Sequence, residues 1–78
     1  MRIEHDTKVN ALYVYLDDSA PFAYNKVLDD RRVIDCAEDG HAIGVEFLNV
    51  SHGVDVRDVP EQAAIGRMLE EHNVKVFA

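Results

Sequence analysis

The fold is decided by residues 33–48, which have the sequence VIDCAEDGHAIGVEFL. Apolar and polar residues alternate on both sides of an Asp-Gly pair, Asp39-Gly40, of the kind that a tight hairpin turn requires. If Asp39 and Gly40 are the two turn residues, Cys36 faces Ile43 and the apolar side chains of both strands share one face. This stretch therefore predicts an antiparallel hairpin.

The same alternation marks three further strands before this hairpin. Two short alternating stretches are separated by the polar residues 6–10, which predicts a first hairpin. The turn-forming residues 17–21 then lead into a third strand. In total the sequence predicts five strands, over residues 2–5, 11–16, 22–28, 32–37 and 41–48.

One helix is predicted in the last third of the chain. Pro60 suits a first helical turn, and Glu61 suits the positive end of the helix dipole. Apolar side chains recur at helical spacing, at Ile65, Met68 and Leu69. Gly66 is expected to mark a close contact between this helix and the sheet, and Asn73 suits a left-handed stop before a short final strand at residues 74–77.

This order of elements predicts an α+β fold. An antiparallel β-meander of about five strands has one C-terminal helix packed on one face and a short final strand. The length of 78 residues predicts a single domain over residues 1–78. Folding buries only about 63% of the surface of so short a chain, so we expect the protein to gain stability from a partner.

Composition narrows the classes of function. Eight Lys and Arg residues against 15 Asp and Glu residues, a net charge of -7, argue against nucleic-acid binding. A membrane span needs about 20 apolar residues, and the longest apolar run, residues 11–16, is far shorter. We therefore expect no membrane partner. A lone cysteine, Cys36, fits a reducing compartment, so we expect a cytoplasmic protein.

Strand parity assigns the side chains to two faces of the sheet. The face that the helix covers is predicted to carry Ile3, Leu12, Val14, Leu16, Ile34, Cys36, Ile43, Val45 and Phe47. The other face is predicted to carry Arg2, Glu4, Tyr13, Tyr15, Asp35 and Glu46. Asp35 and Glu46 are diagonal neighbours on adjacent strands, with backbones about 7–8 Å apart.

Two interpretations of this second face are open. An aromatic and acidic surface is typical of an interface, with a second copy of the chain or with a basic protein partner. Two neighbouring carboxylates beside tyrosines can instead perform acid/base chemistry or bind a small ligand or a cation, because like charges raise one of the two pKa values.

No other site is indicated by the sequence. The histidines at positions 5, 41, 52 and 72 lack the spacing of a metal motif, and neither a nucleophile motif nor a phosphate-binding loop occurs. We therefore predict no metal site, no cofactor and no catalytic residue.

Two segments also carry a family signature, a "DALY"-like hairpin and a "D-x-x-x-DG-x-x-x-GIEIL"-like hairpin. The matching positions are Asp6, Ala11, Leu12, Tyr13, Asp35, Asp39, Gly40, Gly44 and Glu46. Over residues 2–51 the chain resembles the small prokaryotic proteins of domain of unknown function 2283 (DUF2283), although Asn10 replaces the usual acid and Cys36 the usual larger aliphatic residue. Residues 52–78 lie outside the signature.

The resemblance implies a compact α+β protein with no established activity, cofactor or catalytic residue. Some members are thought to lie beside toxin-like genes, which implies an antitoxin-like or partner-binding role. We expect a non-enzymatic interaction module that forms a homodimer or binds a basic protein through Tyr13, Tyr15, Asp35 and Glu46. The alternative is a ligand-binding or cation-binding protein, or an enzyme, that uses the Asp35/Glu46 pair.

Overall fold

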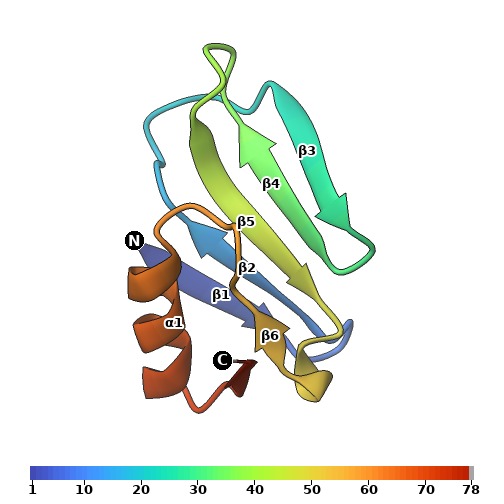
Figure 1. Ribbon diagram of the computed structural model, residues 1–78. Coiled ribbons are helices and arrows are strands. Elements are labelled where there is room, and N and C mark those ends of the chain that lie inside the picture. Colours follow the sequence, from blue (N-terminus) through green and yellow to red (C-terminus); the bar gives the residue numbers. More distant parts are fainter. Residues whose placement is uncertain (78) are drawn as a thin grey trace.

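The computed structural model describes residues 1–77 of the chain (Figure 1). Its elements are β1 (Arg2–Asp6), β2 (Ala11–Tyr15), β3 (Tyr24–Asp29), β4 (Arg32–Cys36), β5 (Ala42–Leu48), the 3-10 helix η1 (Val50–His52), β6 (Val54–Asp55), α1 (Gln62–Glu71) and β7 (Val76–Phe77). The first five strands form one antiparallel sheet. The predicted α+β fold is thereby confirmed. No helix within residues 1–77 is long and apolar enough to cross a membrane.

The strand order is β1-β2-β5-β4-β3. The predicted meander is therefore wrong at one connection, because β2 and β3 are not neighbours in the sheet. Strand β5 pairs with both β4 and β2, and residues 16–23 cross from β2 to the far edge of the sheet (Figure 1). The burial of the strands explains this order. β5 is mostly buried, whereas β3 is almost entirely exposed. An apolar strand is stabilised by a neighbour on each side, and a polar strand such as β3 is tolerated at an edge.

The crossing segment is tied to the β4–β5 turn by His41. The two ring nitrogens of His41 lie 2.9 Å from Asp17 Oδ2 and 2.5 Å from Asp39 Oδ1. Hydrogen bonds with Ser19 and then with His41 lower the pKa of Asp17 to about 2. Hydrogen bonds with Asp17 and then with Asp39 raise the pKa of His41. The cluster therefore links the turn and the crossing segment most strongly when His41 is protonated.

The turn of the β4–β5 hairpin is one residue longer than predicted. Gly40 N donates to Ala37 O at 2.9 Å, which places Glu38 and Asp39 at the centre of the turn, and Gly40 follows them with φ 95°. This is the geometry of a turn followed by a glycine bulge. The extra residue shifts the pairing, so Cys36 lies opposite Ala42 instead of the predicted Ile43.

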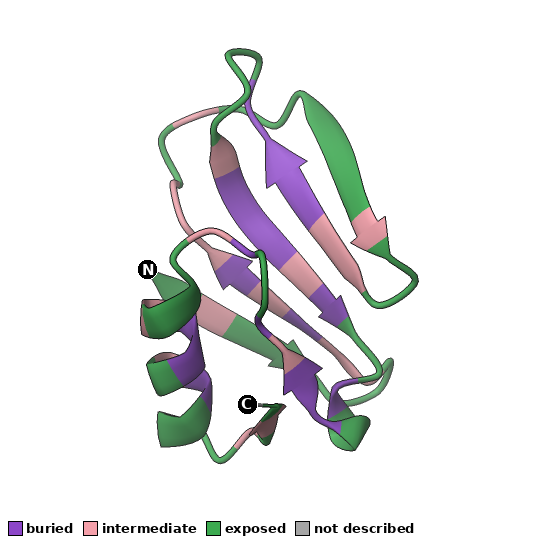
Figure 2. Ribbon diagram, in the orientation of Figure 1, coloured by how far each residue is buried: buried purple, intermediate pink, exposed green. Residues whose placement is uncertain are grey.

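The hydrophobic core lies between one face of the sheet and the C-terminal segment (Figure 2). The sheet contributes Leu12, Val14, Val45 and Phe47, and the later segment contributes Val50, Val54, Val56, Val59, Ile65 and Leu69. Ile34, Cys36 and Ile43 are buried as well, while Ile3 and Leu16 are half-buried. The predicted core face is confirmed.

Helix α1 begins two residues later than Pro60, at Gln62. Residues 57–61 form turns in which Asp58 and Glu61 both have positive φ, and Glu61 O accepts the first helical hydrogen bond, from Ile65 N. The prediction that Pro60 lies in the first helical turn is wrong, because these turns direct Val59 into the core with only 6% of its surface exposed. Glu61 does lie at the positive end of the helix, as its N-cap residue.

The C-terminal end of the helix agrees with the sequence prediction. Asn73 has φ 61° and ends α1, after which β7 pairs with β6 in a separate parallel sheet. At Gly66, however, an added side chain would not meet the main sheet. A Cβ at this position would lie 3.9 Å from Val56 Cγ2, an ordinary contact. The predicted close contact between helix and sheet is wrong at this glycine.

Candidate functional site on the open face

The face opposite α1 carries all six residues that strand parity assigned to it. The name open face is used below for Arg2, Glu4, Tyr13, Tyr15, Asp35 and Glu46. Strand pairing places them in two rows across the sheet, Arg2-Tyr15-Gly44-Asp35 and Glu4-Tyr13-Glu46-Val33. Asp35 and Glu46 are therefore diagonal neighbours on β4 and β5, as predicted.

Tyr13 crosses the sheet over Gly44. A Cβ on Gly44 would lie 2.9 Å from Tyr13 Cε2 and nearer still to Cζ and the hydroxyl oxygen. Real Cβ atoms do not approach a ring this closely, so only glycine leaves room for the ring at this position. Gly44 thus allows the Tyr13 side chain on β2 to reach across β5 to β4.

At the end of this reach, the Tyr13 hydroxyl donates a hydrogen bond of 2.8 Å to Asp35 Oδ2. Asp35 is only 8% exposed, and its Oδ1 is buried without a hydrogen-bond partner among the described residues. Burial, and then the hydrogen bond and charge of Asp35, raise the pKa of Tyr13 well above its usual range. Tyr13 therefore acts as a hydrogen-bond donor at neutral pH and does not ionise.

Glu46 is the second acid of the pair. Burial raises its pKa first, and the neighbouring Asp35 carboxylate raises it further. A protonated Glu46 can donate to Asp35, which would supply the partner that Asp35 Oδ1 lacks. Within residues 1–77, no group of three or more His, Cys, Asp or Glu side chains is arranged to hold a metal ion.

Arg2 and Tyr15 form the other end of the open face. The Tyr13 and Tyr15 rings meet edge to face, with centroids 4.6 Å apart and planes at 75°. The Arg2 guanidinium lies 3.7 Å from the centroid of the Tyr15 ring, and Arg2 Nε is 3.5 Å from an Asp18 carboxylate oxygen. The Tyr15 hydroxyl donates to Glu4 at 3.1 Å. Arg2, the cation of the open face, is therefore already engaged.

Sequence reasoning missed two residues of this site. Asp18 was assigned to a turn, and the crossing of residues 16–23 brings it to Arg2. Gly44 was noted only as part of the family signature. A glycine inside an otherwise apolar strand often marks a close approach by another group, and that signal could have identified the position of the Tyr13 ring.

Comparison with known families assigns the chain. Residues 2–51, more than half of the sequence, match the family described as protein of unknown function (DUF2283), and the chain belongs to this family. The match includes the whole five-stranded sheet and ends before β6 and α1. No curated protein and no solved structure matches the chain.

Proposed function

We propose that the protein is a non-enzymatic interaction module whose open face binds a basic protein. The observation that carries this proposal is the asymmetry of the sheet. One face is covered by the core and α1, while the other presents the Tyr13–Tyr15 ring pair among acidic side chains. Tyrosines are enriched at protein interfaces because a large apolar ring carries a polar end.

The charge of the open face favours a basic partner over a second copy. Glu4 and Glu46 are half-buried or exposed, and the single cation, Arg2, is paired with Asp18. Two copies that met through this face would bring like charges together, in chains that each carry a net charge of -7. A partner rich in Lys and Arg would instead be attracted to it.

A hollow beside Tyr13 suits a basic side chain. Its acidic groups are Glu4, Asp6 and Glu46, and its apolar surface includes Val9 and Leu48, which are 67% and 39% exposed. Lys and Arg place an apolar stem against such a surface and keep the charged group near carboxylates. An antitoxin-like protein that covers a small basic enzyme is one form of this proposal.

The test compares two charge variants in recovery of partners from the source cells. The open-face variant Glu4→Lys with Glu46→Gln and the helix variant Glu70→Lys with Glu71→Gln change the net charge by the same amount, and both helix positions are exposed. We expect the wild type and the helix variant to retain the same basic protein and the open-face variant to lose it. Equal retention by all three, or a homodimer in light scattering that only the open-face variant abolishes, would contradict the proposal.

A second candidate function, a ligand or cation site at Asp35 and Glu46, is favoured by the unpartnered Asp35 Oδ1. Protonation of Glu46 is the competing explanation, and pH separates the two. Because the pKa of Glu46 is raised from 4.5, ionisation of Glu46 opposes folding, and stability should fall as pH rises through the raised value.

The variant Glu46→Gln, whose amide can still donate to Asp35, should remove this fall in stability. Urea unfolding of both proteins between pH 4 and pH 8 makes the comparison. Stabilisation of the wild type by Mg²⁺ or Ca²⁺ that Glu46→Gln abolishes would instead support the cation site.

A further inference from the structure

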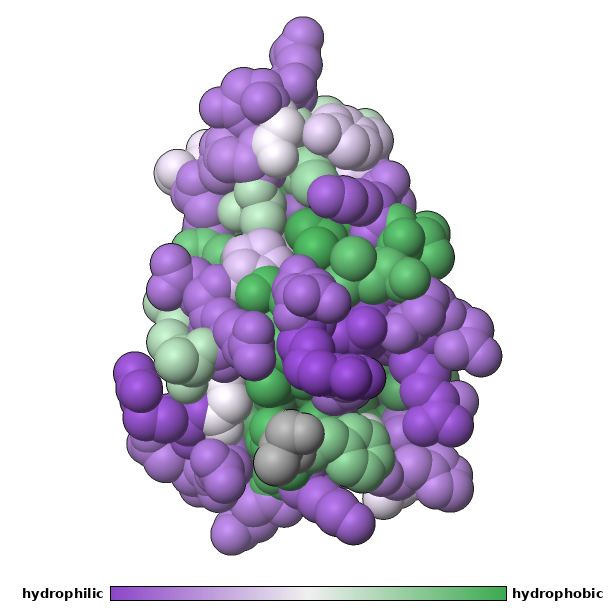
Figure 3. All heavy atoms as spheres, viewed as in Figure 1, coloured by the Kyte–Doolittle hydropathy of each residue, from purple (hydrophilic) through white to green (hydrophobic). Residues whose placement is uncertain are grey.

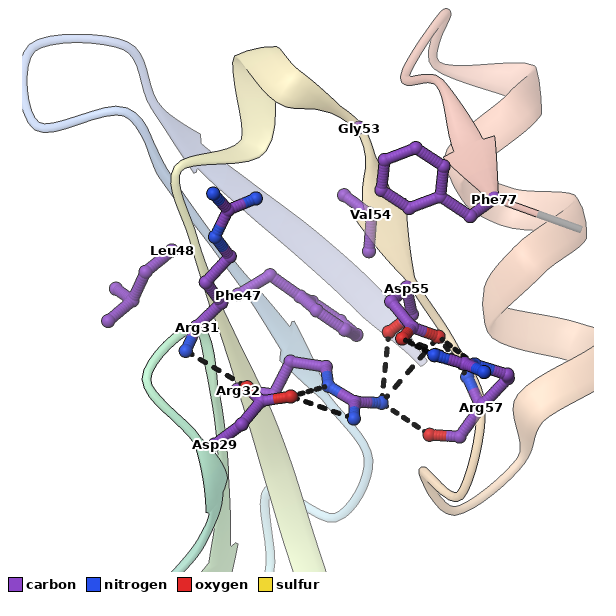
Figure 4. A pocket seen from close by; sticks show the side chains of 10 residues that line it. All are labelled: Asp29, Arg31, Arg32, Phe47, Leu48, Gly53, Val54, Asp55, Arg57 and Phe77. Carbon is purple, nitrogen blue, oxygen red and sulfur yellow. Dashed lines mark hydrogen bonds and ion pairs between the residues drawn. The ribbon is translucent and has the colours of Figure 1, made fainter.

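A second hollow lies away from the open face, where the end of the sheet meets β6 and β7 (Figure 4). It has a volume of about 270 Å³. Phe47, Leu48, Val54 and Phe77 supply its apolar surface, and Arg31, Arg32 and Arg57 are among its charged residues. In Figure 3, apolar surface is visible near the bottom centre of the molecule, below strongly hydrophilic residues.

The apolar wall of this pocket depends on a glycine. Gly53 has φ 101°, and a Cβ there would lie 2.7 Å from Cζ of the Phe77 ring. The absence of a side chain lets this ring lie against the backbone of Gly53, with Val54 beside it (Figure 4). Phe77 is 41% exposed, while Phe47 and Val54 are almost fully buried. One ring of the pocket is thus free to be covered.

Two of the three arginines are already used within the protein. Arg32 lies 2.9 Å from an Asp29 carboxylate oxygen and 3.8 Å from one of Asp55, and it also donates to the backbone carbonyl of Arg57. The Arg57 guanidinium binds Asp55 at 2.7 Å. These contacts hold the β6 segment against the sheet, and the two paired arginines offset the negative charges of Asp29 and Asp55.

Arg31 differs from the other two. Its side chain runs past Phe47 and Leu48 toward the Gly53 side of the pocket, and Figure 4 draws no ion pair or hydrogen bond to its guanidinium from the residues that line the pocket. In a chain with 15 acids and five arginines, three arginines meet at this one hollow. A local positive charge on an acidic protein, next to an exposed aromatic ring, suits an anion with an apolar body.

We propose that this pocket binds a small aromatic carboxylate, with the ring of the ligand against the exposed ring of Phe77 and its carboxylate on Arg31. The volume fits a single ring, since pockets for drug-sized ligands begin at about 300 Å³. Arg binds a carboxylate through two parallel N–H groups, which fixes the orientation of the ligand as well as its charge. This site is separate from the open face and does not depend on the proposed protein partner.

The test is an NMR titration of the whole chain with benzoate. We expect saturable shifts of the amides of Leu48, Gly53 and Val54, with a dissociation constant of about 1 mM for so small a ligand. Benzyl alcohol, which keeps the ring and lacks the charge, should bind at least about tenfold more weakly.

Two variants identify the residue that binds the charge. Arg31→Gln should weaken benzoate binding about tenfold, since it removes one charge-assisted pair. Arg67→Gln, an exposed position on α1 with the same change in net charge, should leave the binding unchanged. Shifts that do not saturate, equal binding of benzyl alcohol, or equal effects of the two variants would overturn the proposal.

Discussion

Replacing Gly44 by alanine adds one methyl group at the point where Tyr13 crosses β5. The new Cβ would lie 2.9 Å from Tyr13 Cε2 and nearer still to two other atoms of the ring, so the ring must move away from the sheet. Its hydrogen bond of 2.8 Å to Asp35 is then lost. Asp35, with only 8% of its surface exposed, would then have no hydrogen-bond partner among the described residues for either carboxylate oxygen.

The expected cost follows from these contacts. A hydrogen bond to a charged group contributes about 1.5–3 kcal/mol, and alanine in place of glycine in a strand returns about 0.5–1 kcal/mol. We therefore expect Gly44→Ala to lower the free energy of unfolding by about 1–2 kcal/mol. With a urea dependence of about 1 kcal/mol per molar for a small domain, the midpoint of unfolding should fall by about 1–2 M.

A double-mutant cycle isolates the cause of this loss. In a Tyr13→Ala background the ring is absent, so Gly44→Ala should become neutral or slightly stabilising. Urea unfolding followed by circular dichroism measures all four proteins. A loss of the same size in both backgrounds would refute the reasoning, because the methyl group would then be acting on something other than Tyr13.

Three other perturbations have clear expected outcomes. Gly66→Ala should stabilise the protein by about 0.5–1 kcal/mol in urea unfolding, because the methyl group has room and alanine favours a helix. Arg32→Met should cost about 1–3 kcal/mol in the same assay, because Asp29 loses its ion pair and the backbone carbonyls of Asp55 and Arg57 lose a charged donor. In an NMR titration, the pKa of His41 should lie above 6.5, and Asp17→Asn should lower it. The stabilisation that His41 gives should be complete below the pKa of His41 in the unfolded chain, and it should disappear as pH rises through the raised pKa of the folded protein. An unshifted His41, or an Arg32→Met protein as stable as the wild type, would contradict these assignments.

The composition of the two faces could be predicted from the sequence, but the order of the strands could not. Alternation along each strand fixes which side chains share a face, so Val14 and Val45 were placed together in the core, and Tyr13 and Glu46 on the other side. Strand order depends instead on which strand can be buried between two neighbours. That comparison places β5 at the centre and β3 at the edge, and it is made only when the whole sheet forms.

Two local features also could not be predicted from the spacing of apolar and polar residues in the sequence. The sequence placed Asp35 and Tyr13 on the same face, yet their hydrogen bond depends on the space above Gly44, which periodicity does not describe. Likewise, Pro60 is typical of a helix start, but burial of Val59 requires two positive-φ turns first, so α1 begins at Gln62. In both cases a tertiary contact determined the local structure.

Photo-crosslinking from the open face, in the source cells, tests the proposed function most directly. The photoreactive residue p-benzoylphenylalanine is placed at Tyr15, whose ring is half-buried at the solvent side of the sheet, and in a second protein at the exposed helix residue Glu70. The proposed function predicts a crosslink from position 15 to a basic protein and none to that protein from position 70. Crosslinks from position 15 only to a second copy of the chain, or to the same protein from both positions, would contradict it.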